Sequence, residues 1–188
     1  MHWVEAESRP GVGEDPTSWK ALISSKGSVV QTVSAPRRLS ETEFARIASL
    51  VRARRHSEIK PRDYFTAQQY SADLTASQTA RLRERIEKVD FVQVARVFAK
   101  FPPGESATVG VSIHAAGGVS QATGQYDVVR LLPEYTASGL LTVEECQNYR
   151  RALEAFFELW NEIRDVMPWR SGSMVGPREG TVRSGESL

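Results

Sequence analysis

The sequence lacks what several common classes of protein require. Among its 188 residues there is one cysteine, Cys146, and there are three histidines. An internal disulfide is therefore excluded, as is a structural zinc site with several cysteine and histidine ligands. With 24 basic and 23 acidic residues the net charge is +1, so the chain as a whole has no electrostatic attraction for nucleic acid or acidic lipid. A content of 40% hydrophobic and 25% charged residues is typical of a globular protein.

Signals for export and membrane insertion are also missing. No stretch approaches the roughly 20 consecutive apolar residues that a membrane-spanning helix needs. Residues 1–20 are polar and include four acidic side chains, so they have neither the basic flank nor the apolar centre of a secretion signal. We therefore expect a cytoplasmic protein, in which a single thiol stays reduced.

The sequence contains none of the common catalytic signatures. There is no phosphate-binding loop, no nucleophile turn of the Gly-x-Ser-x-Gly type, no His-Glu-x-x-His pair and no dinucleotide-binding glycine pattern. The pair Gly11 and Gly13 lies in a polar stretch and is followed by Glu-Asp-Pro rather than by a helix start. We therefore predict no cofactor and no metal ligand.

Three segments carry the signature of a helix start. In each, a leucine precedes a Ser or Thr, and a Glu or Gln follows three positions later, which together form a capping box. The three pairs are Ser40 with Glu43, Thr75 with Gln78, and Thr142 with Glu145. Apolar residues at helical spacing follow each start. In the first helix the stripe expected to be buried consists of Phe44, Ile47, Leu50 and Val51, and the third helix must end before Pro168.

Two β-hairpins are predicted from strand-forming residues on either side of a turn. The first joins residues 19–24 to 28–33, and the second joins residues 108–115 to 119–126. Lys26-Gly27 and Gly117-Gly118 supply the turns, since glycine adopts the positive φ that tight hairpins need. Residues 90–101 fit either an extension of the second helix or a buried strand.

These elements predict an α+β fold in which an antiparallel sheet of two hairpins is packed on one side by three main helices. The expected order is hairpin, helix, helix, hairpin, helix. We expect a single domain over residues 18–168, between a flexible N-terminal segment of residues 1–17 and a disordered tail of residues 169–188. Residues 55–72 are expected to form a long connection, which is a common place for function.

One group of polar residues could support acid–base chemistry. Ser112 and His114 lie on the polar face of the predicted strand 108–115, and Asp127 follows its hairpin partner. A histidine near a carboxylate is the minimum for a general base, so a small enzyme with a His114-centred site on the open sheet face is one alternative. An exposed sheet face carries polar side chains in any case, and we assign no catalytic residue. We interpret Cys146, early in the third helix, as a small buried apolar residue.

Charge is unevenly distributed along the chain. Residues 34–62 contain eight basic and three acidic side chains, whereas residues 142–167 contain three basic and six acidic ones. A polarised surface steers an oppositely charged partner toward the protein. The alternative is that these are ordinary solvated helix faces whose charges pair within the fold.

Cations and aromatic rings alternate between residues 52 and 70. The side chains that we expect to contact a partner are Arg54, Arg55, Arg62, Tyr64, Phe65 and Tyr70. Arg and Tyr are frequent anchors of protein interfaces, and the same mixture can bind phosphates and stack on bases. Because the net charge is close to zero, a protein partner is favoured, and nucleic-acid binding through residues 52–70 is a second alternative.

The sequence therefore favours a non-enzymatic macromolecule-binding protein. The type we expect is a cytoplasmic inhibitor, immunity protein or adaptor of a bacterium or phage, which acts by steric occlusion of a protein partner. The many aromatic residues of the third helix also predict a homodimer through residues 142–167.

Overall fold

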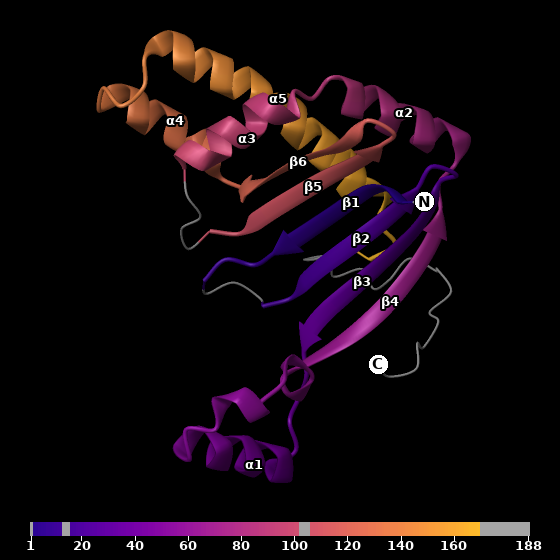
Figure 1. Cartoon of the computed structure of the whole chain (residues 1–188), viewed down its shortest axis with the longest axis vertical. Helices are drawn as coiled ribbons and strands as arrows, with labels where there is room; N and C mark the ends of the chain where they lie inside the picture. The colour runs from indigo at the N-terminus through magenta and orange to yellow at the C-terminus, as the bar shows by residue number, and fades with distance from the viewer. Residues whose placement is uncertain (1, 13–15, 102–105, 170–188) are drawn as a thin grey trace.

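The computed structural model describes residues 2–12, 16–101 and 106–169, and its centre is a six-stranded antiparallel sheet (Figure 1). The strands are β1 (His2–Arg9), β2 (Ser18–Ser24), β3 (Ser28–Pro36), β4 (Phe65–Asp73), β5 (Thr108–Ala115) and β6 (Gly118–Gln125). Their order across the sheet is β4-β3-β2-β1-β5-β6. Every neighbouring pair is antiparallel.

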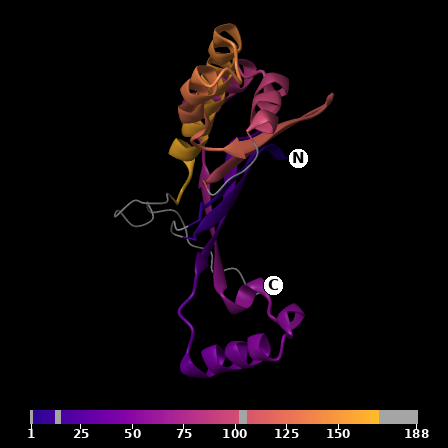
Figure 2. The same cartoon turned by 90° about the vertical axis from the view of Figure 1, so that its left-hand side faces the viewer.

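The helices divide into a packed group and one that stands apart. The helices are α1 (Glu41–Arg52), α2 (Ala76–Glu87), α3 (Phe91–Lys100), α4 (Val128–Ala137) and α5 (Val143–Val166), with short 3-10 turns η1 (His56–Glu58) and η2 (Pro61–Asp63). Helix α5 packs against α2, α3 and α4, and α3 packs against β6. Figure 2 shows α4 and α5 beside the sheet and α1 at the opposite end of the molecule.

The α+β class expected from the sequence is confirmed, and the three capping boxes are present at α1, α2 and α5. Both predicted hairpins also form, as β2 with β3 and as β5 with β6. The expected number of elements was too small, because β1, β4, α3 and α4 complete the fold. Residues 90–101 form a separate helix, since the Asp90 side chain accepts the Gln93 N–H and starts a new turn after α2 has ended.

The expectation of a flexible segment over residues 1–17 is wrong for β1. This strand lies between β2 and β5 and pairs with both of them. Val4 and Ala6 are buried on the helix-covered face, while Glu5 and Glu7 alternate with them and are half-buried on the other face. The N-terminal strand is therefore the link between the two hairpins.

The expectation of a long loop over residues 55–72 is wrong for its second half. β4 pairs with β3 along its whole length, from Phe65 opposite Pro36 to Asp73 opposite Ser28. Tyr70 is buried in the core and its hydroxyl donates a hydrogen bond of 2.6 Å to the side-chain oxygen of Gln68. Tyr70 therefore stabilises the fold and is not available as a partner contact.

The core is aromatic where α5 crosses the sheet. Trp160 stacks on Trp19 of β2 with ring centroids 5.2 Å apart, and Phe156 meets the edges of Phe91 and Phe98 from α3. The aromatic residues that suggested a dimer through residues 142–167 pack mainly within one chain. Tyr149, Phe156 and Trp160 are buried and Phe157 is half-buried. The dimer through α5 was predicted from an excess of exposed aromatic residues, and the structure does not show that excess.

A buried glutamine binds the backbone of Trp169. The Gln31 side chain donates to the Trp169 carbonyl at 3.0 Å and accepts from the Trp169 N–H at 2.9 Å. Trp169 also packs against the core. The expectation that it belongs to a disordered tail is therefore wrong. The rest of that predicted tail, residues 170–188, lies outside the described residues.

Candidate functional site

Between β3 and β4 the chain leaves the sheet and forms a separate projection, which we call the arm (residues Arg37–Tyr64). It contains α1, η1 and η2 and extends beyond the end of the β3–β4 ribbon (Figures 1 and 2). A backbone hydrogen bond of 2.9 Å from the Arg37 N–H to the Tyr64 carbonyl closes its base. Within it, η1 packs against α1, and η2 packs against the start of β4.

The arm is held together by charged groups. Arg37 pairs with Glu43 and Arg46 pairs with Asp63, each at 2.6 Å. The Ser40 backbone N–H and the Arg37 guanidinium lower the pKa of Glu43 to about 2. The backbone N–H of Lys60, with a further contribution from Arg46, lowers the pKa of Asp63. Both carboxylates are therefore charged at neutral pH and connect the start of α1 to the turn before β4.

Part of the apolar face of α1 is left uncovered. Ile47 points into the arm and is buried, but Phe44 is 65% exposed and Val51 is 44% exposed. With the half-buried Ala48, these residues are spaced i, i+4 and i+7, so they lie on one side of the helix. We call Phe44, Ala48 and Val51 the α1 stripe.

Arginines without partners lie at the two ends of α1. In the described part of the chain, Arg38, Arg52 and Arg54 are exposed and have neither an ion pair nor a side-chain hydrogen bond. Arg54 has a φ of 56°, a left-handed conformation that ends α1 and turns the chain toward η1. The C-terminal end of the helix is therefore cationic beside exposed apolar side chains.

Three acidic residues of α5 form ion pairs within the chain. Glu162 pairs with Arg81 at 3.1 Å, Glu158 pairs with Arg85, and Glu145 pairs with Lys100 at 3.2 Å. The arm thus keeps the excess of cations that the sequence predicted. The predicted excess of negative charge on α5 is reduced by these ion pairs.

The residues predicted to contact a partner differ in their exposure in the structure. Arg54, Arg62 and Tyr64 are exposed on the arm, and Arg55 is exposed but pairs with Glu58. Phe65 begins β4 and is half-buried, while Tyr70 belongs to the core as described above. Sequence reasoning missed Phe44 and Val51, because their helical spacing was interpreted as a buried stripe.

His114 has a different carboxylate neighbour from the one expected. Its Nε2 lies 3.8 Å from a carboxylate oxygen of Glu5 on β1, and Glu5 also pairs with Lys20 at 3.1 Å. The hydrogen bond from Lys20 lowers the pKa of Glu5. Ser112 is opposite Glu5 in the β1–β5 register, so it lies on the same face.

Asp127 is not part of this group, which corrects the predicted set of His114, Ser112 and Asp127. The hairpin register places His114 near the turn and Gln125 opposite Thr108 at the other end. Six residues of strand separate the two ends, about 20 Å. Asp127 instead precedes α4 and accepts a hydrogen bond of 2.9 Å from the Ser106 hydroxyl. The three side chains cannot act on one substrate atom together.

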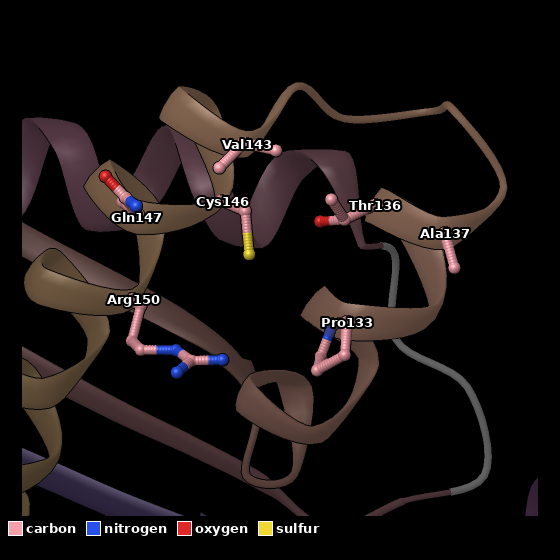
Figure 3. A pocket seen from close by; sticks show the side chains of 7 residues that line it. All are labelled: Pro133, Thr136, Ala137, Val143, Cys146, Gln147 and Arg150. Carbon is pink, nitrogen blue, oxygen red and sulfur yellow. The ribbon is translucent and has the colours of Figure 1, made fainter.

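A small cavity lies between α4 and the start of α5 (Figure 3). It has a volume of about 410 Å³ and is lined by Pro133, Thr136, Ala137, Val143, Cys146, Gln147 and Arg150. Cys146 is half-buried, and its sulfur faces the Leu132 carbonyl at 4.0 Å. Arg150 is the one charged residue of the lining, so the cavity holds no acid–base pair.

No protein-family model matches the sequence, and a search of curated proteins returned no similar chain. Among the described residues, no helix combines the length and apolarity needed to cross a bilayer. The same residues contain no cluster of three or more His, Cys, Asp and Glu that could hold a metal ion. Fold and site together define an α+β protein with a projecting cationic arm.

Proposed function

We propose that this protein is a non-enzymatic protein-binding module, a cytoplasmic inhibitor, immunity-type protein or adaptor, that inserts α1 into an apolar groove of its partner. The proposal rests on one observation above all, the exposed α1 stripe beside unpaired arginines on a part of the chain that projects from the sheet. Occlusion of the partner's groove by the arm is the mechanism.

The spacing of the α1 stripe fits recognition of a helix in a groove. Such helices present apolar anchors at i, i+3, i+4 and i+7 to a hydrophobic channel. Phe44, Ala48 and Val51 supply three of these positions, and the fourth, Ile47 at i+3 on the same face, is buried within the arm. Burying the exposed parts of the Phe and Val side chains contributes about 1–2 kcal/mol each.

Charge defines the rim of the groove that would accept α1. Arg38, Arg52 and Arg54 have no carboxylate partner among the described residues, so a partner with acidic residues around an apolar groove complements them. Complementary charge raises the association rate and discriminates against other partners more than it raises affinity.

The internal ion pairs of the arm prepare it for binding. Arg37 with Glu43, and Arg46 with Asp63, connect the two ends of the arm before any partner is present. A surface that is already ordered loses less conformational entropy on association. This favours a preformed helix rather than a segment that folds on binding.

Affinity purification tests the proposal with two variants of the arm and a matched control. Tagged wild-type protein and the double variants Phe44→Ser/Val51→Ser and Arg52→Glu/Arg54→Glu are incubated with lysate of the producing organism. The control is Val92→Ser/Leu140→Ser, whose two side chains are 64% and 67% exposed outside the arm. We expect both arm variants to lose a retained protein at least about tenfold, and the control to keep it. All four proteins should melt at similar temperatures, because exposed side chains contribute little to stability.

Three results would reject the proposal. One is retention of the same protein by both arm variants at wild-type levels. Another is recovery of nucleic acid whose binding falls steeply with added salt, which would favour the nucleic-acid alternative. The third is loss of the biological effect in His114→Ala while the protein partner is still captured, which would favour an enzyme.

A further inference from the structure

Among residues 2–12, 16–101 and 106–169, no strand pairs with the outer edge of the sheet at β4. β3 is its one neighbour there, so half of the backbone N–H and C=O groups of β4 point away from the sheet. Thr66, Ala67, Gln68 and Gln69 are all exposed, which means that both faces of this stretch are uncovered as well as its edge.

β4 lacks the features that usually prevent an edge strand from pairing with another chain. Lysine or proline in the edge strand, a bulge or a covering helix are the common protections. From Phe65 to Ala72 there is no charged residue and no proline, and the register with β3 runs over nine residues without a bulge. A regular, uncharged edge of this length is a template for a further strand.

The opposite edge of the sheet differs. In β6, Ala122 and Gly124 are buried, and the Phe98 ring of α3 packs on Gly124 so closely that no Cβ would fit. In β6, residues 118–121 next to the hairpin turn and Thr123 are exposed. β4 is therefore the edge strand with less helix packed on it.

The charges at the two ends of β4 favour a second copy of β4 as the strand that pairs with this edge. The strand ends in one acidic residue, Asp73, and begins next to a cationic region that contains Arg38 and Arg62. In an antiparallel pair of two β4 strands centred on Gln69, Asp73 of each copy lies opposite Phe65 of the other, at the strand end where the chain carries Arg38 and Arg62. No like charges then face each other along the strand, and the favourable arrangement occurs twice because the pair is symmetric.

We propose that two copies of this chain associate through β4, edge to edge and antiparallel with Gln69 at the two-fold axis, into one continuous sheet. Strand pairing alone makes a small interface, so the dissociation constant is expected to be micromolar. The α1 stripe lies outside the paired edge, so the two proposals can be tested separately. Each dimer presents two arms.

Sedimentation velocity of the full chain, from about 1 to about 200 µM, tests the pairing. We expect the wild-type mass to rise from monomer toward dimer over this range. Gln69→Lys places two ammonium groups opposite each other at the axis and should weaken dimerisation about tenfold or more. The matched control is Gln121→Lys, the same substitution at an exposed glutamine of β6, which should leave dimerisation unchanged. Circular dichroism checks that both variants are folded.

Mixing opposite charges tests the position of the axis. An equimolar mixture of Gln69→Lys and Gln69→Glu should form heterodimers in native mass spectrometry more readily than either variant forms homodimers. The proposal is overturned if the wild type is monomeric over the whole range, if Gln69→Lys dimerises as the wild type does, or if Gln121→Lys abolishes the dimer. Phe44→Ser/Val51→Ser should dimerise normally, so a failure of the arm proposal and a failure of this one give different results.

Discussion

Replacing Gln31 by leucine should destabilise the protein although the new side chain is apolar and similar in size. Gln31 is fully buried in β3, and both of its amide atoms bond to the backbone of Trp169, at 3.0 and 2.9 Å. Leucine fills the space but leaves the Trp169 N–H and carbonyl without partners. These two bonds join residues that are 138 positions apart in the sequence, so they hold the segment that follows α5 on the sheet.

The magnitude follows from the cost of leaving a buried polar group unpaired, which is about 1–3 kcal/mol for each group. Apolar burial of the leucine offsets part of this cost, and the Trp169 backbone is only part-buried. We therefore expect a loss of about 2–3 kcal/mol in the free energy of unfolding, and a decrease in Tm of roughly 5–10 °C for a chain of this size.

Urea denaturation followed by circular dichroism measures this change. Thr32→Ala is the control, because Thr32 is the next residue of β3 and is exposed on the other face. It should stay within about 0.5 kcal/mol of the wild type. If Gln31→Leu also stays within that range, the bonds to Trp169 do not contribute to stability and the reasoning is wrong.

Gln31→Glu gives an independent check through pH. The carboxylate can still accept from the Trp169 N–H, but it cannot donate to the Trp169 carbonyl until it is protonated. Burial and the facing carbonyl oxygen raise the pKa of this glutamate in the folded state above its unfolded value. Stability relative to the wild type should therefore be greatest at acidic pH, below the unfolded pKa, and should be lost as the pH rises through the folded pKa. An unchanged difference between the two proteins at all pH values would contradict this arrangement.

Two further predictions concern packing and pH. Gly124→Ala should cost about 2 kcal/mol or more, because the new Cβ would lie 2.1 Å from the Phe98 ring, whereas Gly117→Ala, with nothing within 4 Å, should be nearly neutral in the same thermal melts. Acidification should loosen the arm first: the folded pKa of Glu43 is lowered from 4.5 to about 2, so its contribution is present above the unfolded value and is lost as the pH falls toward about 2. The protection factors of the α1 amides in hydrogen exchange should fall over that interval in the wild type but not in Glu43→Gln, and an equal fall in both would exclude Glu43 as the cause.

The elements that the sequence predicted are those with a strong local signal. A capping box satisfies backbone groups within four residues, so Ser40, Thr75 and Thr142 could be identified without knowledge of the fold. The two hairpins likewise combine regular alternation with a glycine-containing turn.

β1 and β4 carry weaker signals for opposite reasons. β1 is central, but its two buried residues, Val4 and Ala6, are few and alternate with glutamates that suggest a solvated tail. β4 is an edge strand of which Tyr70 alone is buried, so it needs almost no alternation to be stable. Their pairing depends on β2, β3 and β5, and no local pattern contains that information.

The candidate site also could not be predicted from local sequence patterns alone. The spacing of Phe44 and Val51 correctly indicated an amphipathic helix, but spacing does not show what the apolar face will pack against. That depends on where the chain between β3 and β4 is placed, which only the three-dimensional arrangement shows. An apolar stripe on a helix can therefore be part of the core or part of an interface, and the exposure of its side chains in the structure distinguishes the two.

The arm owes its local order mainly to hydrogen bonds and ion pairs rather than to apolar burial. Ile47 is the single buried residue of α1, whereas the capping box, Arg37 with Glu43 and Arg46 with Asp63 connect its ends. Phe44 and Val51 accordingly contribute little to the folded state of the isolated chain, and leaving them in water has an unfavourable hydration free energy. The core, by contrast, is completed by α5 on the sheet. Stability and recognition are therefore carried by different residues, which is why the arm variants can be expected to lose binding while the sheet and its helices stay intact.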